Sequence, residues 1–259
     1  MCEKIVVTSG KGGVGKTTFV LNLGITLGKK GKRVCLIDFD FGLNNLDVVS
    51  GVENLVVFDL IDVMNNKCRV KQALIKSPNY ENLYILPTTH SLQKNIIIEN
   101  IKSIINDLEV LFDYIIIDCP AGIDVGFHRA ISCSTYAICI TTPHLSSIRD
   151  ADKVISILKS YRLKGVKIVV NRVRGDLVLS EQTFSYQDIE STLLVEVLGV
   201  LPEDDLLNTY SSIIPNTQSE KAYKIIAENL LNGENKIYDC FSKYRGFFGS
   251  IRKELKRRL

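Results

Sequence analysis

The chain has 259 residues, of which 46% are hydrophobic and 24% are charged. These proportions are close to those of soluble globular proteins and argue against a disordered, collagen-like or disulfide-scaffold chain. No apolar run approaches the roughly 18 residues that span a bilayer, and no signal-peptide core follows Met1. The seven cysteines are an odd number without CxxC spacing, which favours reduced thiols in a reducing compartment. We therefore expect a cytoplasmic location.

The net charge of +3 is unevenly distributed along the chain. Residues 243–259 contain seven Lys and Arg and one Glu, which leaves a net charge of −3 for the rest. A basic tail on a mildly acidic body points to an anionic partner for the tail alone. We expect no nucleic-acid partner for the body.

Runs rich in Val and Ile recur along the chain, and most are separated by segments long enough for a helix. Continuous hydrophobicity is typical of strands covered on both faces, as in a parallel sheet. The predicted strands are residues 4–8, 33–38, 83–87, 114–118, 136–142, 167–171 and 195–201. The predicted helices are residues 16–28, 95–108, 147–161, 220–231 and the C-terminal stretch. The sequence thus predicts an α/β domain at 1–235, with a mostly parallel central sheet and helices on both faces, and a C-terminal region at 236–259.

The strongest motif directly follows the first predicted strand. Residues 10–17 fit the pattern GxxxxGK[ST] and open a helix, as in a P-loop NTPase. Glycines let main-chain N–H groups converge on phosphate, Lys16 reaches the β- and γ-phosphates, and the Thr17 hydroxyl can bind Mg²⁺. The expected nucleotide contacts in this loop are Gly10, Lys11, Gly12, Gly13, Val14, Gly15, Lys16, Thr17 and Thr18.

Carboxylates follow two further predicted strands. Asp38 and Asp40 come after the second strand, and Asp118 ends the fourth. Right-handed crossovers put the loops after parallel strands on one edge of the sheet, so these side chains should lie near the P-loop. Asp118 suits the position that holds Mg²⁺ through water, and Gly122 could let the main chain approach the γ-phosphate.

The sequence KGGVGKT at residues 11–17, with its additional Lys11, resembles the deviant Walker A (MinD/ParA) family of ATPases. The resemblance implies an ATP-dependent homodimer in which Lys11 reaches the partner's nucleotide, as an arginine finger does elsewhere. It also implies that Asp40 helps position the attacking water and that Asp38 supports the magnesium shell. An alternative for Asp38 is that it caps the following turn.

ATP is favoured over GTP because the sequence has no NKxD motif, the usual guanine reader. By resemblance, the adenine would be bordered by Asn171, Pro202, Glu203 and Asp204. Asn171 could otherwise be a turn residue.

The C-terminal stretch is amphipathic when it is numbered as a helix. Phe247, Phe248, Ile251 and Leu255 gather on one face, and Lys253 and Lys256 lie opposite. This pattern favours a helix that lies on an anionic membrane surface. The alternatives are a final helix docked on the core and a tail that binds nucleic acid or protein.

The resemblance extends to the septum-site-determining members of the family through the segments IDFDFGLNNLD, DCPAGI, SSIRDAD and GVLPED. It implies a protein peripheral on the cytoplasmic face of the inner membrane, which recruits the division inhibitor MinC, blocks FtsZ rings at the poles, and responds to MinE or another topological factor. Asn45 and Asp152 are the candidate partner-binding residues. Two residues depart from the family pattern. Cys119 stands after Asp118 where Ser or another small residue is expected, and Asn44 stands where the family commonly has Arg.

Other classes of function remain as alternatives. A ParA-like ATPase that positions DNA or cargo would need a basic patch on the folded body, whereas the body of this chain has a net charge of −3. A regulator of flagellar number is nearer to the sequence, although such proteins usually carry an N-terminal extension. An iron–sulfur carrier would need two bridging cysteines, and Cys133 has no clear second.

Overall fold

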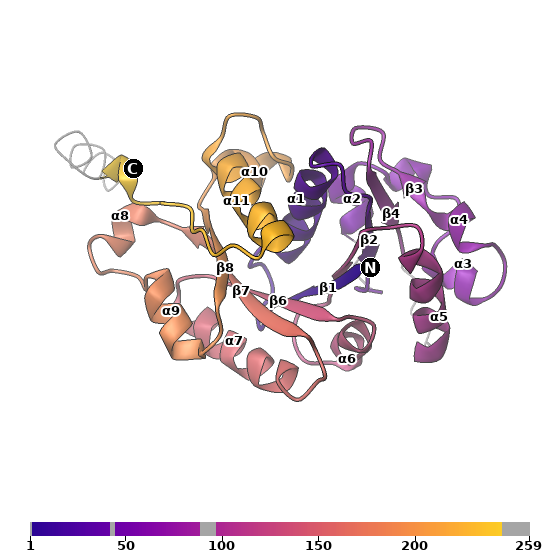
Figure 1. Ribbon diagram of the computed structural model, residues 1–259, viewed down its shortest axis with the longest axis horizontal. Coiled ribbons are helices and arrows are strands. Elements are labelled where there is room, and N and C mark those ends of the chain that lie inside the picture. The colour runs from indigo at the N-terminus through magenta and orange to yellow at the C-terminus, as the bar shows by residue number, and fades with distance from the viewer. Residues whose placement is uncertain (1, 42–44, 89–96, 245–259) are drawn as a thin grey trace.

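The computed structural model describes residues 2–41, 45–88 and 97–244 (Figure 1). Within these residues, eight strands form one sheet in the order β3-β4-β2-β5-β1-β6-β7-β8. Neighbouring strands are parallel, except that β3 is antiparallel to β4. The strands are β1 (Glu3–Thr8), β2 (Val34–Asp38), β3 (Ile75–Lys76), β4 (Leu83–Leu86), β5 (Tyr114–Asp118), β6 (Tyr136–Thr141), β7 (Gly165–Val173) and β8 (Val197–Pro202). The predicted fold class is confirmed.

Each predicted strand coincides with an observed strand to within two residues at either end. The prediction succeeds because strands buried on both faces show continuous apolar runs; β2, β5 and β8 are buried along their whole length. The edge strand β3 was missed, since two residues give no hydrophobic period. It is defined by its pairing with β4 through Ile75 and Ile85.

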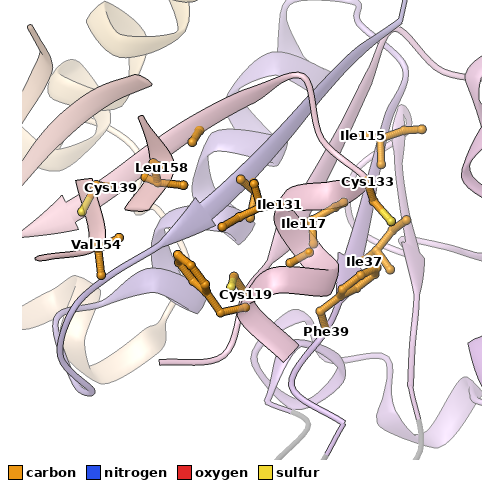
Figure 2. Packing of buried hydrophobic residues seen from close by; sticks show 14 of the residues in the cluster. Ile37, Phe39, Ile115, Ile117, Cys119, Ile131, Cys133, Cys139, Val154 and Leu158 are labelled. Atoms are coloured by element: carbon orange, nitrogen blue, oxygen red, sulfur yellow. The ribbon is translucent and has the colours of Figure 1, made fainter. Parts of the chain in front are cut away.

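Helices cover both faces of the sheet, because successive strand residues point to opposite sides. In β1, Ile5 and Val7 pack in one core and Val6 in the other. The first core is covered by α1 (Lys16–Lys29), α2 (Leu46–Ser50), α10 (Asp205–Tyr210) and α11 (Gln218–Asn232). The second is covered by α3 (Leu60–Met64), α4 (Val70–Ala73), α5 (Ile98–Glu109), α6 (Val125–Ser132), α7 (Leu145–Leu158) and α9 (Tyr186–Leu193). Figure 2 shows side chains of this second core from β2, β5, β6, α6 and α7.

The longer predicted helices are present as α1, α5, α7 and α11. The prediction missed the eight-residue helices α6 and α9, whose starts depend on local capping. The Asp124 carboxylate accepts a hydrogen bond from the Phe127 main-chain N–H, and the Ser185 hydroxyl accepts one from Asp188. The remaining helical segments of the described residues are three short turns: Glu53–Leu55, α8 (Gly175–Val178) and Ser242–Tyr244.

The strand order places the P-loop at the middle of the sheet. Strand β1 lies between β5 and β6, and the chain reaches strands on both sides of it. In such sheets, ligands bind outside the carboxyl ends of the strands where the order reverses. The P-loop, Asp38, Asp118, Asn171 and Pro202 all lie at or near the carboxyl ends of their strands and so belong to this edge.

The chain after α11 returns over the domain. The Asn229 side chain bonds with the main-chain N–H and carbonyl of Lys236, and Ile237 and Tyr238 pack against the core. The division at residues 235 and 236 stays a prediction. The predicted membrane contacts Phe247, Phe248, Ile251, Lys253, Leu255 and Lys256, together with Asn44, lie outside the described residues. Among the helices that the structure describes, none is both long and apolar enough to cross a membrane.

Candidate nucleotide-binding site

The P-loop connects β1 to α1 in a conformation that requires glycine. Gly13 and Gly15 have φ angles of 75° and 95°, in the left-handed region that other residues seldom adopt. A Cβ at Gly10 would lie 2.3 Å from the main-chain carbon and oxygen of Asp150 in α7. The loop therefore rests against α7 and leads directly into the first turn of α1, whose free main-chain N–H groups are suited to bind phosphate.

Asn171 is brought from β7 to the P-loop. Its side-chain Nδ2 donates a 2.8 Å hydrogen bond to the main-chain carbonyl of Val14. A Cβ at Gly15 would lie 2.5 Å from the same nitrogen. Asn171 thus connects the predicted base-binding edge to the phosphate-binding loop.

A second set of bonds connects the P-loop to the segment after β5. The Ser9 hydroxyl donates to the Lys11 carbonyl at 2.7 Å, and the Gly122 N–H donates to the Ser9 carbonyl at 3.4 Å. Gly122 has a φ of 92°. Sequence reasoning missed Ser9, whose signal was its place between β1 and the first loop glycine.

Asp38 and Asp118 lie side by side because β2 and β5 pair in register at these residues. Both are buried, at 2% and 4% exposed. Burial, followed by the charge of Asp38, raises the pKa of Asp118 to about 7; a hydrogen bond with the Thr17 hydroxyl and the charge of Lys16 act against this rise. Burial is also the main cause that raises the pKa of Asp38. The charge of Asp118 is therefore poorly compensated by the described residues.

The residues at this position fit a Mg²⁺ ion. Asp118 Oδ1 is buried and has no hydrogen-bond partner among the described residues, and the Thr17 hydroxyl is bonded to the same carboxyl group. Hard oxygen ligands of this kind, completed by phosphate and water, are typical of magnesium in nucleotide sites. The described residues include no group of three or more His, Cys, Asp or Glu that could hold a metal.

Both oxygens of Asp38 accept hydrogen bonds from the following turn. Oδ1 accepts from the Asp40 N–H at 2.8 Å, and Oδ2 accepts from the N–H groups of Asn45 and Leu46 at 3.2 Å. This is the geometry of the turn-capping alternative, and the role of Asp38 in the magnesium shell stays a prediction. Asp40 is partly buried and lies two residues after Asp38, at the same edge of the sheet.

The residues after β8 are held by local bonds. Asp204 Oδ1 caps α10 by accepting from the Leu206 and Leu207 N–H groups, and Oδ2 accepts from the Ser219 hydroxyl. Glu203 accepts from the Asn208 side chain. Pro202 is the buried last residue of β8. These bonds fix the wall at which adenine is predicted to bind.

The two candidate partner residues are exposed. Asn45 precedes α2, and Asp152 lies on the outer face of α7. Asp152 is two residues beyond Asp150, against which Gly10 packs. Residues two apart on a helix point to different sides, so the exposed Asp152 side chain points away from the side of α7 that contacts Gly10.

Cys119 follows Asp118 but is 1% exposed. Burial raises the pKa of its thiol, which disfavours the reactive thiolate. Its place among Ile117, Ile131 and other apolar side chains (Figure 2) is that of a small hydrophobic residue.

Comparisons with known proteins agree with this site. A family model described as an AAA domain matches residues 2–168. The septum site-determining protein MinD of Bacillus subtilis (strain 168) is 40% identical, over 96% of this chain and 99% of that protein. A chain of the MinC:MinD cell division protein complex of Aquifex aeolicus has a TM-score of 0.84 at 37% identity, covering 91% of this chain and 97% of that one.

MinD of Pyrococcus horikoshii, solved in complex with Mg-ADP, has a TM-score of 0.78 at 29% identity, covering 90% of this chain and 97% of that one. The residues matched by the family model, 2–168, include the P-loop and the carboxylate pair. The chain belongs to the MinD family of septum site-determining ATPases.

Proposed function

We propose that this chain is an ATPase that dimerises with ATP, binds the inner membrane from its cytoplasmic face, and places the division site by recruiting MinC and blocking FtsZ rings at the poles. The observation that carries the proposal is the buried Asp118 Oδ1 of a MinD-family chain, which has no hydrogen-bond partner among the described residues. These relatives do not favour the DNA- or cargo-positioning alternative, nor a regulator of flagellar number.

Nucleotide binding would use the P-loop in the conformation described above. Main-chain N–H groups of Gly12, Gly13, Gly15 and Lys16 would bind the phosphates, with the positive end of α1 behind them. The Lys16 ammonium would neutralise the β- and γ-phosphates. Thr17 and Asp118 would hold Mg²⁺, which supplies charge neutralisation on the transferred phosphate.

Hydrolysis would require a second copy of the chain. Lys11 is exposed on the P-loop and can reach outward to the nucleotide of a partner, where its charge would stabilise the transition state as an arginine finger does. Asp40 would orient the attacking water. Its N–H is bonded to Asp38, so the segment that carries Asp40 is fixed to the carboxylate pair.

Membrane binding would depend on the tail at residues 245–259, which has few large apolar residues. A helix of about 14 residues is marginal in water, so one tail would bind lipid weakly. An ATP-dependent dimer presents two tails, and the second binds at high effective concentration. Hydrolysis would then release the protein from the membrane.

MinC recruitment is supported by the related structure that contains MinC and MinD. The exposed Asn45 and Asp152 are the residues that we propose for this surface, with MinE or another topological factor as a further partner. The Asn45 N–H is bonded to the Asp38 carboxylate, so a partner that contacts Asn45 could respond to dimerisation.

The test is co-sedimentation with anionic vesicles in ATP, in ADP and without nucleotide. Wild-type protein should pellet with ATP, whereas Lys16→Ala and Ile251→Glu should not. Addition of purified MinC should then give a ternary pellet with ATP that Asp152→Ala weakens. Absence of pelleting by the wild type with every nucleotide would refute the membrane-bound function.

A further inference from the structure

The last described residues of the chain pack against α8. Cys240 and Tyr244 are 3% and 8% exposed. A Cβ at Gly175 would lie 2.1 Å from the Cys240 carbonyl oxygen and 3.2 Å from the Tyr244 ring. The main chain at Cys240 therefore packs closely on the first residue of α8, and Tyr244, the last described residue, lies beside the same residue.

A groove of about 510 Å³ lies along the connection from α8 to α9. Val178 and Phe184 give it an apolar floor, and Phe184 is 40% exposed. Val178 is three residues beyond Gly175, about one helical turn. The groove is thus next to the point at which the tail begins.

The groove is acidic. Its lining includes Glu181 and Asp188 and, within the described residues, no Lys or Arg. Neither carboxylate takes part in an ion pair between described residues. Asp188 is hydrogen-bonded to Ser185, which keeps it in its charged form. An apolar floor with acidic walls complements an apolar face flanked by Lys and Arg, whereas an anionic membrane surface would be repelled.

We propose that the tail occupies this groove when it is not bound to lipid, with its apolar residues on Val178 and Phe184 and its basic residues near Glu181 and Asp188. This inference rests on the proposed function, because it concerns when the tail is available to the membrane. As a helix, the 15 residues of the tail would span about 22 Å. Attachment at Tyr244 gives a high effective concentration, so weak contacts suffice.

Docking of the tail would lower membrane affinity in proportion to the undocked fraction. If about 10% of tails are free, release of the tail raises vesicle binding about tenfold at limiting lipid. A monomer would then rarely bind membrane. In the dimer, two tails bind lipid together, so lipid would compete more effectively with the grooves for the tails. The groove therefore increases the difference in membrane affinity between the monomer and the ATP-dependent dimer.

The first arm of the test uses hydrogen exchange on the full chain without lipid. Ile251→Glu should raise the exchange of the groove peptide, residues 178–188, at least about threefold, because a charge on the apolar face undocks the tail. Exchange in α5 should not change. Raised salt should have the same effect as the substitution, since the charge contribution is screened. Equal exchange of residues 178–188 in wild type and Ile251→Glu would overturn the proposal.

The second arm measures binding to anionic vesicles in ADP. Phe184→Ser should raise binding several-fold, whereas the control Val110→Ser, at an 84% exposed site after α5, should not. A decrease with Phe184→Ser would mean that the groove contacts lipid and would overturn the proposal. A wild type that never binds vesicles would refute the membrane function, and the exchange arm would still decide whether the tail is docked.

Discussion

Replacing Asp118 with asparagine should stabilise the nucleotide-free protein and abolish its magnesium-dependent activity. The carboxylate is 4% exposed, lies beside Asp38 across the β2–β5 pairing, and has one oxygen without a partner among the described residues. Its charge is therefore unfavourable until Mg²⁺ arrives. Asparagine has nearly the same shape and no charge, so the substitution removes the unfavourable interaction and the metal ligand together.

The size of the effect follows from the pKa. The folded protein raises the pKa of Asp118 from 3.8 to about 7, and one pKa unit corresponds to about 1.4 kcal/mol. At pH 8 the full shift corresponds to a destabilisation of at most about 4 kcal/mol. Part of this free energy belongs to the interaction with Asp38. We expect Asp118→Asn to raise the free energy of unfolding by about 2 to 4 kcal/mol at pH 8.

The effect should depend on pH in a defined direction. Because the pKa is higher in the folded state, the folded chain binds more protons than the unfolded chain between about pH 4 and pH 7. The stability of the wild type should therefore rise as the pH falls from 8 to 5. The advantage of Asp118→Asn should shrink over the same range.

Urea unfolding in EDTA at pH 8 and pH 5, followed by circular dichroism, measures this difference. Asp152→Asn is the matched control, because the same chemical change at an exposed residue should alter stability by less than about 0.5 kcal/mol. With Mg²⁺ and ATP, the wild type should gain stability and Asp118→Asn should not. An Asp118→Asn protein less stable than the wild type at pH 8 in EDTA would refute the reasoning.

Two further substitutions and two chemical treatments test the site. Gly10→Ala should push the P-loop from Asp150, cost about 1 to 3 kcal/mol of stability and weaken the binding of fluorescent ADP; unchanged affinity would contradict the close packing at Gly10. Asn171→Ala removes the bond to the Val14 carbonyl, about 1 kcal/mol, and should weaken ADP binding roughly fivefold in calorimetry; an unchanged dissociation constant would mean that the bond is irrelevant to binding. Peroxide should leave ATPase activity intact, and iodoacetamide should label Cys68 before the buried Cys119 in the native protein; rapid native labelling of Cys119 would argue for a reactive thiol.

The elements that could be predicted are those whose signal is local. The seven long strands were found because burial on both faces forces unbroken apolar sequence, and α1, α5, α7 and α11 because each spans several turns. The two residues of β3 and the short helices α6 and α9 were missed, since pairing with β4 and single capping bonds define them. The apolar groove beside α8 had no sequence signal, because its wall is formed by the connection between two short helices.

The candidate site divides in the same way. The sequence by itself determined the P-loop, the carboxylates that end β2 and β5, and the family, since each is a contiguous motif. Tertiary structure alone decided that Asp38 and Asp118 share a buried position, that Asn171 bonds to the carbonyl of Val14, and that Gly10 rests on α7. These contacts join residues 80 to 157 positions apart or pack a loop on a distant helix. They follow from strand order and register, which no local pattern encodes, because the free energy that selects them comes from packing the whole sheet between its two helical layers.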